Sequence, residues 1–281
     1  MPQGGGTRDF SYGVAGHLEL FEAGGNEVDF LVDDDGRLGE IARLPGQPDE
    51  ESVELLYDGR SFLSSVVNGT GSATPTYSSD GLLLALERQD SGVAPVEEFS
   101  VFYFAGRPVA QLKEVDASPT FTYLTTDHLG TPLLATDEAG VDVWAGPFDP
   151  FGGNTFGQAL ESDVFLRLPG RWADSLWQGA SSGANVYYNV HRWYQYGTGR
   201  YGRVDPLRSQ GDLHPYAYAA SNPLLLVDPL GEKSRVCCRK IPVVGVLGFR
   251  HCYVSRWLEN AWLERPPSFR ANRPEWRASH A

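Results

Sequence analysis

Two aspartates that each precede a proline are the residues of this chain best suited to chemistry. Asp205-Pro206 and Asp228-Pro229 lie 23 residues apart. Two carboxyl groups that share one proton can hydrolyse a peptide bond, because one acts as base on water and the other as acid on the carbonyl oxygen. Each following proline stiffens the chain. The sequence alone does not bring the two carboxyl groups together, and most Asp-Pro pairs are simple turns.

An aromatic run over residues 187–194 precedes the first aspartate and contains Arg192. An arginine close to two carboxylates can hold one of them ionised or orient a neighbouring loop. Arg200 and Arg203 are nearby competitors for that role. An arginine within an aromatic run can also serve packing alone.

Other polar candidates have simpler interpretations. His128 and His191 are expected to be hydrogen-bonded structural histidines. The glycine-rich stretch 151–154 lacks the strand and helix of a phosphate-binding loop, so the sequence predicts a turn there. No cofactor is expected.

The charge of the chain divides it in two. Residues 1–232 hold 13 Lys and Arg against 33 Asp and Glu, whereas residues 233–281 hold 10 against 3. This change of sign indicates two modules, an acidic body that repels nucleic acid and a basic tail that could bind it. No apolar run reaches the ~18 residues of a membrane span, and the N-terminus lacks the apolar core of a signal peptide.

A degenerate repeat recurs between residues 10 and 156. Its marker glycines are spaced by 20 to 25 residues: Gly16, Gly36, Gly59, Gly81, Gly106 and Gly130. Each unit combines an alternating strand, an Asp/Asn-x-Gly turn and a second strand, which predicts an array of β-hairpins with few helices. The 32 glycines and 19 prolines agree with many tight turns. Periodicity alone would also allow a propeller or an open β-solenoid.

The degenerate Tyr-Asp-Gly-Arg units resemble the YD repeats of rearrangement-hotspot (Rhs) proteins. The likeness is strongest in a series of motifs that occur in the order of the Rhs repeat-associated core: residues 124–137, 148–152, 168–171 and 189–231. The resemblance implies residues 1–99 as weak YD hairpins and residues 100–231 as the core. Residues 232–281 would then be a variable C-terminal toxin or toxin remnant.

The resemblance also implies the fold and the activity. The fold would be mainly β, with antiparallel hairpins that form the closing end of a β-cocoon shell. The chain would be the C-terminal portion of a polymorphic toxin, exported to the cell surface or beyond for interbacterial competition. Its partners would be the enclosed tail, an immunity protein and a component of a secretion system.

In this family a pair of aspartates and an arginine form an aspartyl-protease-like site that cuts after Pro-x-x-x-x-Asp-Pro-x-Gly-Leu. The corresponding residues begin at Pro223 and run through Asp228 and Pro229 to Gly231 and Glu232. Asp205, Asp228 and Arg192 would be catalytic, and the cut would fall between Glu232 and Lys233. Glu232 stands where the family has leucine, so an acidic side chain beside an acidic pair is expected to slow or shift the cut.

The tail leaves three alternatives open. Cys237, Cys238, His251 and Cys252 could bind zinc, although adjacent pairs are poor chelators, so no metal site is assigned. A cysteine with His251 could begin a thiol hydrolase. A truncated remnant is the simplest alternative, and the sequence predicts a helix over residues 255–264. For the body, the alternative to a toxin shell is a non-catalytic surface module whose aromatic strands bind carbohydrate or protein.

Overall fold

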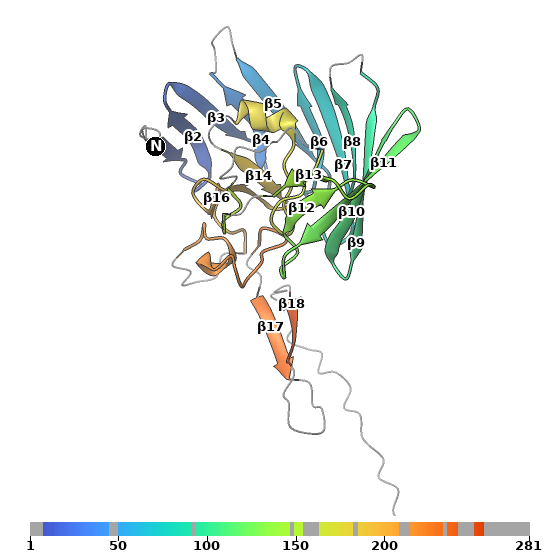
Figure 1. Cartoon of the computed structure of the whole chain (residues 1–281). Coiled ribbons are helices and arrows are strands. Elements are labelled where there is room, and N and C mark those ends of the chain that lie inside the picture. Colours follow the sequence, from blue (N-terminus) through green and yellow to red (C-terminus); the bar gives the residue numbers. More distant parts are fainter. Residues whose placement is uncertain are drawn as a thin grey trace, which may run out of the picture.

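The computed structural model describes residues 8–44, 50–90, 94–146, 149–153, 163–181, 185–207, 214–232, 235–240 and 250–255. Thirteen strands form one antiparallel sheet in which the spatial order follows the chain order (Figure 1). The strands are β1 (Arg8–Tyr12), β2 (Leu18–Ala23), β3 (Asn26–Val32), β4 (Leu38–Arg43), β5 (Glu51–Tyr57), β6 (Leu63–Asn68), β7 (Gly71–Tyr77), β8 (Leu83–Asp90), β9 (Glu97–Phe104), β10 (Arg107–Val115), β11 (Ser118–Thr126), β12 (Pro132–Thr136) and β13 (Asp142–Ala145). The predicted mainly β, antiparallel architecture is confirmed.

Each marker glycine lies in the turn that joins an odd-numbered strand to the next even-numbered one. In most of these turns a side chain accepts the backbone N–H groups two and four residues later, as Asp33 and Asp127 do. The residue three positions after it has positive φ, which glycine adopts without steric cost. At β5–β6 that residue is Ser61, so Gly59 marks the turn without occupying its left-handed position.

Replacement of Asp127 by alanine is expected to destabilise the chain by about 1–2 kcal/mol. The Asp127 carboxylate accepts the N–H groups of Leu129 and Thr131, each at 2.8 Å. Chemical denaturation would measure the loss. Asp80→Ala is the matched control, because Ser78 makes the equivalent bonds in its turn and the change should cost under ~0.5 kcal/mol. Equal losses in the two variants would contradict the assignment.

Side chains alternate along the strands, so that one face of the sheet is buried. The described residues between 163 and 232 cover this face. Their aromatic side chains make polar contacts with the sheet at three places: Trp193 Nε1 to the Tyr57 hydroxyl at 3.0 Å, Trp172 Nε1 to the Tyr77 hydroxyl at 3.1 Å, and Leu63 N to the Tyr188 hydroxyl at 2.8 Å. A buried indole or phenol needs such a partner, so these bonds fix how the covering segment lies on the sheet.

The covering segment has little regular structure of its own. A short helix α1 (Ser175–Ala180) packs on strands β4 to β7. A three-stranded sheet follows, made of β14 (Val186–Asn189), β15 (Arg192–Gln195) and β16 (Arg200–Tyr201). A 3-10 turn, η1, spans Ala219–Ser221. Figure 1 shows α1 and β14 against one side of the large sheet.

The boundary predicted between residues 99 and 100 falls inside β9, and the sheet continues across it. That division stays a prediction about sequence motifs. In the tail, β17 (Arg235–Lys240) and β18 (Arg250–Ser255) form a hairpin whose register sets Cys238 opposite Cys252. The helix predicted over 255–264 lies outside the described residues apart from Ser255, which ends β18. None of the helices in the described ranges is long and apolar enough to cross a membrane.

Candidate functional site

The turn between β14 and β15 holds the chain at residues 228–231. The Asn189 side-chain amide donates to the Asp228 carbonyl at 2.9 Å, and His191 N donates to the Leu230 carbonyl at 3.1 Å. Arg192 Nε donates to the Gly231 carbonyl. Gly231 has φ +66°, and a Cβ there would lie 2.5 Å from the Asn189 carbonyl oxygen, so only glycine fits.

Arg192 lies between the two aspartates. Its Nη2 is 3.1 Å from Asp205 Oδ2 and 3.0 Å from Asp228 Oδ2, which places these two oxygens at most about 6 Å apart. All three residues are buried, with exposed fractions of 1%, 5% and 3% for Arg192, Asp205 and Asp228. The structure therefore brings together the arginine and both carboxyl groups that the sequence singled out.

Both aspartates are fixed by further backbone contacts. Asp205 N donates to the Pro215 carbonyl at 3.0 Å, and Asp205 Oδ1 accepts Leu207 N at 2.9 Å. Asp228 Oδ1 accepts Glu232 N at 3.0 Å. The peptide unit between residues 231 and 232 is thus bound at both ends, by Arg192 at its oxygen and by Asp228 at its nitrogen.

The three prolines of the motifs take different places. Pro223 is buried, whereas Pro206 is exposed next to Asp205. Pro229 packs against Gly170, where a Cβ would come within 2.1 Å of the Pro229 carbonyl oxygen. Gly170 has φ +80°, so this close approach also requires glycine.

Burial raises the pKa of the Asp228 carboxyl, because the charged form loses hydration. The positive charge of Arg192 and a hydrogen bond from Tyr201 oppose this rise, and the neighbouring charge of Asp205 adds to it. The site therefore combines a carboxyl group that resists ionisation with two donors that favour its charged form.

Sequence reasoning missed three residues that contact the site. Tyr201 donates its hydroxyl to Asp228 Oδ2 at 2.8 Å. Arg171 Nη2 and Asn189 Nδ2 both donate to that hydroxyl, at 3.1 and 2.8 Å. Their one sequence signal is their place within the Rhs-like motifs, because nothing in a single sequence separates a phenol that binds a carboxylate from one that only packs.

The competing arginines lie elsewhere. In the described part of the chain, no ion pair joins Arg200 or Arg203 to Asp205 or Asp228. Arg200 is exposed on β16. Burial lowers the pKa of Arg203, which lines a neighbouring cavity.

His128 Nε2 lies 3.0 Å from the Leu224 carbonyl oxygen, as expected of a structural histidine. His191 Nε2 lies 3.3 Å from Glu232 Oε1, and both side chains are largely buried. The acidic side chain at position 232 therefore faces a histidine. Lys233 lies outside the described residues. In the described ranges, no group of three or more His, Cys, Asp or Glu residues is placed to hold a metal ion.

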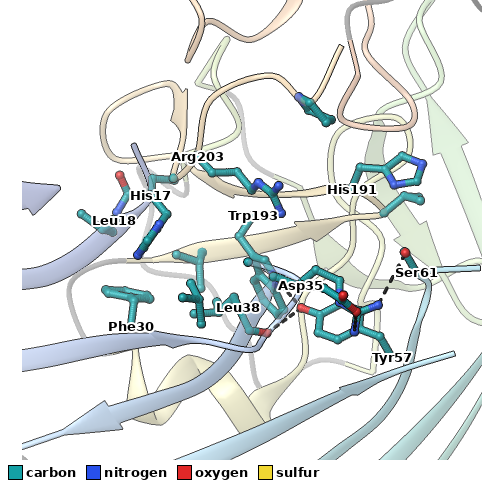
Figure 2. Close-up of a pocket in the computed structure, with 18 of the residues that line it drawn as sticks. His17, Leu18, Phe30, Asp35, Leu38, Tyr57, Ser61, His191, Trp193 and Arg203 are labelled. Carbon is teal, nitrogen blue, oxygen red and sulfur yellow. Dashed lines mark hydrogen bonds and ion pairs between the residues drawn. The ribbon is translucent and has the colours of Figure 1, made fainter. Parts of the chain in front are cut away.

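A cavity of about 220 Å³ adjoins the site, between the covering segment and strands β2 to β5 with their turns (Figure 2). Glu232, His191 and Pro206 line it on the side of the aspartates, and Phe30 and Tyr57 line it on the side of the sheet. Glu232, which directly follows the bound carbonyl group of Gly231, therefore lines this cavity.

No family model matches the chain, but it is similar to proteins named as toxins. The Toxin protein Tse5 of Pseudomonas aeruginosa is 35% identical over 131 residues, which are 46% of this chain and 9% of that protein. The Double-stranded DNA deaminase toxin A of Burkholderia cenocepacia is 31% identical over 185 residues, or 64% of this chain and 12% of that toxin. The chain thus spans about a tenth of the length of these relatives.

Solved structures are also similar to this chain in fold. The crystal structure of TcdB2-TccC3 matches 80% of this chain and 13% of that chain, with a TM-score of 0.56 and 16% sequence identity. The form of TcdB2-TccC3 without its hypervariable C-terminal region matches equally well, with a TM-score of 0.56 and 17% identity. The chain is therefore similar in sequence to proteins named as toxins, which supports the resemblance to Rhs-type polymorphic toxins, and its large sheet is similar in fold to part of TcdB2-TccC3.

Proposed function

We propose that this chain cleaves itself near Glu232 and so releases its basic C-terminal tail from a β-shell. The observation that carries the proposal is the position of Arg192, which contacts both carboxylates and the carbonyl oxygen of Gly231. A cation, two buried carboxyl groups and a bound peptide segment are the parts that acid–base hydrolysis of a peptide bond needs.

The reaction consumes one water molecule and uses Asp205 and Asp228 as the carboxyl pair. The ionised carboxyl takes a proton from water while the water oxygen attacks the carbonyl carbon of Glu232. The protonated carboxyl gives its proton to the carbonyl oxygen. When the tetrahedral intermediate collapses, the C–N bond breaks, the Lys233 nitrogen takes a proton and both carboxyl groups return to their starting state. Arg192 offsets the negative charge that develops close to it.

The tail would be the cargo of the shell. It is basic where the body is acidic, so opposite charge favours its retention until export. A toxin of this kind needs a secretion system to leave the cell and an immunity protein to protect the producer. The relatives named as toxins, and the solved form of TcdB2-TccC3 that lacks a hypervariable C-terminal region, support this division into shell and variable tail.

Intact-mass spectrometry of the purified full chain tests the proposal. Cleavage between Glu232 and Lys233 yields a fragment of 49 residues, and cleavage one bond earlier yields 50. Either fragment would support self-cleavage, and its mass identifies the bond. A chain that keeps its full mass over days between pH 4 and pH 8 would end the proposal.

Replacement of Glu232 by glutamine is expected to accelerate cleavage about threefold to tenfold. The change keeps the size of the side chain but removes a negative charge beside the carboxyl pair, which corresponds to about 0.7–1.4 kcal/mol. A time course of fragment appearance would measure the cleavage rate. Glu98→Gln is the control, because Glu98 is an exposed residue of β9. A slower rate would mean that the contact between Glu232 and His191 assists cleavage, and an unchanged rate would mean that the charge at position 232 has no effect on it.

A second candidate function rests on the outer face of β9 and β11. Phe102, Phe121 and Tyr123 form a row there, with ring centroids 6.2 and 6.3 Å apart, and Phe102 and Tyr123 are 44% and 47% exposed. Such a row suits the apolar face of a sugar. Binding of a glycan array by the chain, lost in Tyr123→Ala, together with an intact chain mass, would favour this adhesion role over self-cleavage.

A further inference from the structure

Behind Asp228 lies a second buried layer of polar side chains. Arg171 is 1% exposed, and its guanidinium carbon lies 3.9 and 3.6 Å from the ring centroids of Tyr194 and Tyr218. In the described structure its single side-chain hydrogen bond goes to the hydroxyl of Tyr201. Tyr201 in turn contacts Asp228, so a buried cation reaches the carboxylate through one phenol.

The direction of this hydrogen-bond chain can be fixed from its members. Arg171 can only donate. The Asn189 nitrogen that contacts Tyr201 also contacts the Asp228 carbonyl oxygen, which can only accept, so that atom must be the amide nitrogen. The Tyr201 oxygen therefore receives two donors, and its own proton must point to Asp228 Oδ2, 2.8 Å away.

We propose that Tyr201, with Arg171 behind it, is a positioning residue that keeps Asp228 the ionised member of the carboxyl pair. Asp228 then serves as the base of the proposed cleavage. This inference rests on the proposed self-cleavage. Asp228 Oδ2 accepts from Tyr201 and Arg192, whereas Asp205 Oδ2 accepts from Arg192 alone among the contacts of the described residues.

The surroundings of Asp228 act on its ionisation in both directions. Burial, followed by the neighbouring charge of Asp228, raises the pKa of Tyr201 well above its ordinary value, so the phenol stays protonated and remains a donor. Burial raises the pKa of Asp228 as well, and Arg192, the Tyr201 hydrogen bond and Arg171 counter that rise. The titratable and charged groups that face Asp228 are Arg171, Arg192, Tyr201, Asp205, and Glu232 with its partner His191.

Replacement of Tyr201 by phenylalanine tests the proposal, because it keeps the ring on which Arg192 stacks at 3.6 Å and removes only the hydroxyl. Loss of a donor to the charged form favours the protonated form, so the acidic limb of the pH–rate profile should move to higher pH. On that limb the cleavage rate should fall about tenfold or more, while the alkaline limb stays in place. Tyr218→Phe is the matched control, since the buried Tyr218 hydroxyl has no partner among the described residues.

An equal loss of rate at every pH, or the same shift in Tyr218→Phe, would overturn the role of Tyr201. If the wild type does not cleave, the proposed function fails, but the inference about Asp228 keeps its own readout. The titration of Asp228 can be followed by ¹³C NMR of a chain labelled at its aspartate carboxyl groups. The signal of Asp228 is identified because it is absent from Asp228→Asn. Asp228 should titrate at higher pH in Tyr201→Phe than in the wild type. An unmoved titration would reject the inference independently of cleavage.

Discussion

Replacement of Asp228 by asparagine is expected to leave the purified chain at its full mass. Asparagine keeps the shape of the side chain, and its oxygen can still accept a hydrogen bond from Tyr201 or Arg192. It cannot take a proton from water at neutral pH. Loss of a positioned acid or base slows a reaction by about 10²–10⁴-fold. The 49-residue fragment should therefore be absent from the mass spectrum over the period in which the wild type is fully cut.

Two further variants make this result specific. Asp205→Asn removes the other carboxyl group and should block cleavage equally, because the pair acts as a unit. Asp80→Asn changes an exposed aspartate at a hairpin turn and should leave cleavage unaltered. Circular dichroism of all three variants checks that they fold. The same fragment at the same rate from Asp228→Asn would exclude a carboxyl-pair mechanism.

The hairpins of the large sheet could be predicted from the sequence because their determinants are local. One strand, one turn and a second strand take 20 to 25 residues, and the turn residue needs only its neighbours to set its conformation. Ser61 illustrates the limit of that reasoning. The glycine pattern pointed to Gly59, but hydrogen bonds from the amides of residues 60 and 62 to Asp58 put the positive φ at Ser61.

The candidate site could be predicted only in part, since it depends on contacts between distant residues. Family resemblance singled out Asp205, Asp228 and Arg192, but three arginines were available in residues 192–203. The choice among them depends on burial: β15 is buried along its whole length, Arg192 included, whereas β16 exposes Arg200 and buries Tyr201. The burial of a polar residue shows only in the folded chain.

The polar layer behind Asp228 was outside the reach of sequence reasoning for a related reason. Arg171 lies 57 positions before Asp228 in the sequence, and Tyr201 lies 27 before it. An aromatic residue inside an aromatic run is ordinarily packing, and Tyr194 and Tyr218 do pack in that way around Arg171. Only the position of one hydroxyl relative to one carboxylate oxygen distinguishes Tyr201 from these neighbours.

Replacement of Arg192 by methionine is expected to lower the free energy of unfolding at pH 7 by about 3–5 kcal/mol. Arg192 pairs with two buried carboxyl groups, and removal of one partner from a buried ionic group leaves uncompensated charge. The change also removes hydrogen bonds to the carbonyl oxygens of Pro215 and Gly231. Urea denaturation would measure the loss, and Arg200→Met, at an exposed site on the next strand, should cost under ~0.5 kcal/mol.

The pH dependence of the Arg192→Met variant separates lost charge compensation from lost packing. Burial already raises the folded-state pKa of Asp228, and without the cation that pKa rises further above the unfolded-state value. The folded variant then binds more protons than the unfolded chain, so its stability increases as the pH falls through the folded-state pKa toward the unfolded-state pKa. The difference in the free energy of unfolding between Arg192→Met and the wild type should therefore become smaller at acidic pH. At pH 7, adding both Asp205→Asn and Asp228→Asn to the Arg192→Met variant should recover most of the lost stability. A gap that stays constant with pH would show that Arg192 acts through its packing on Tyr201 and its bonds to the backbone, and the electrostatic account of the site would then be wrong.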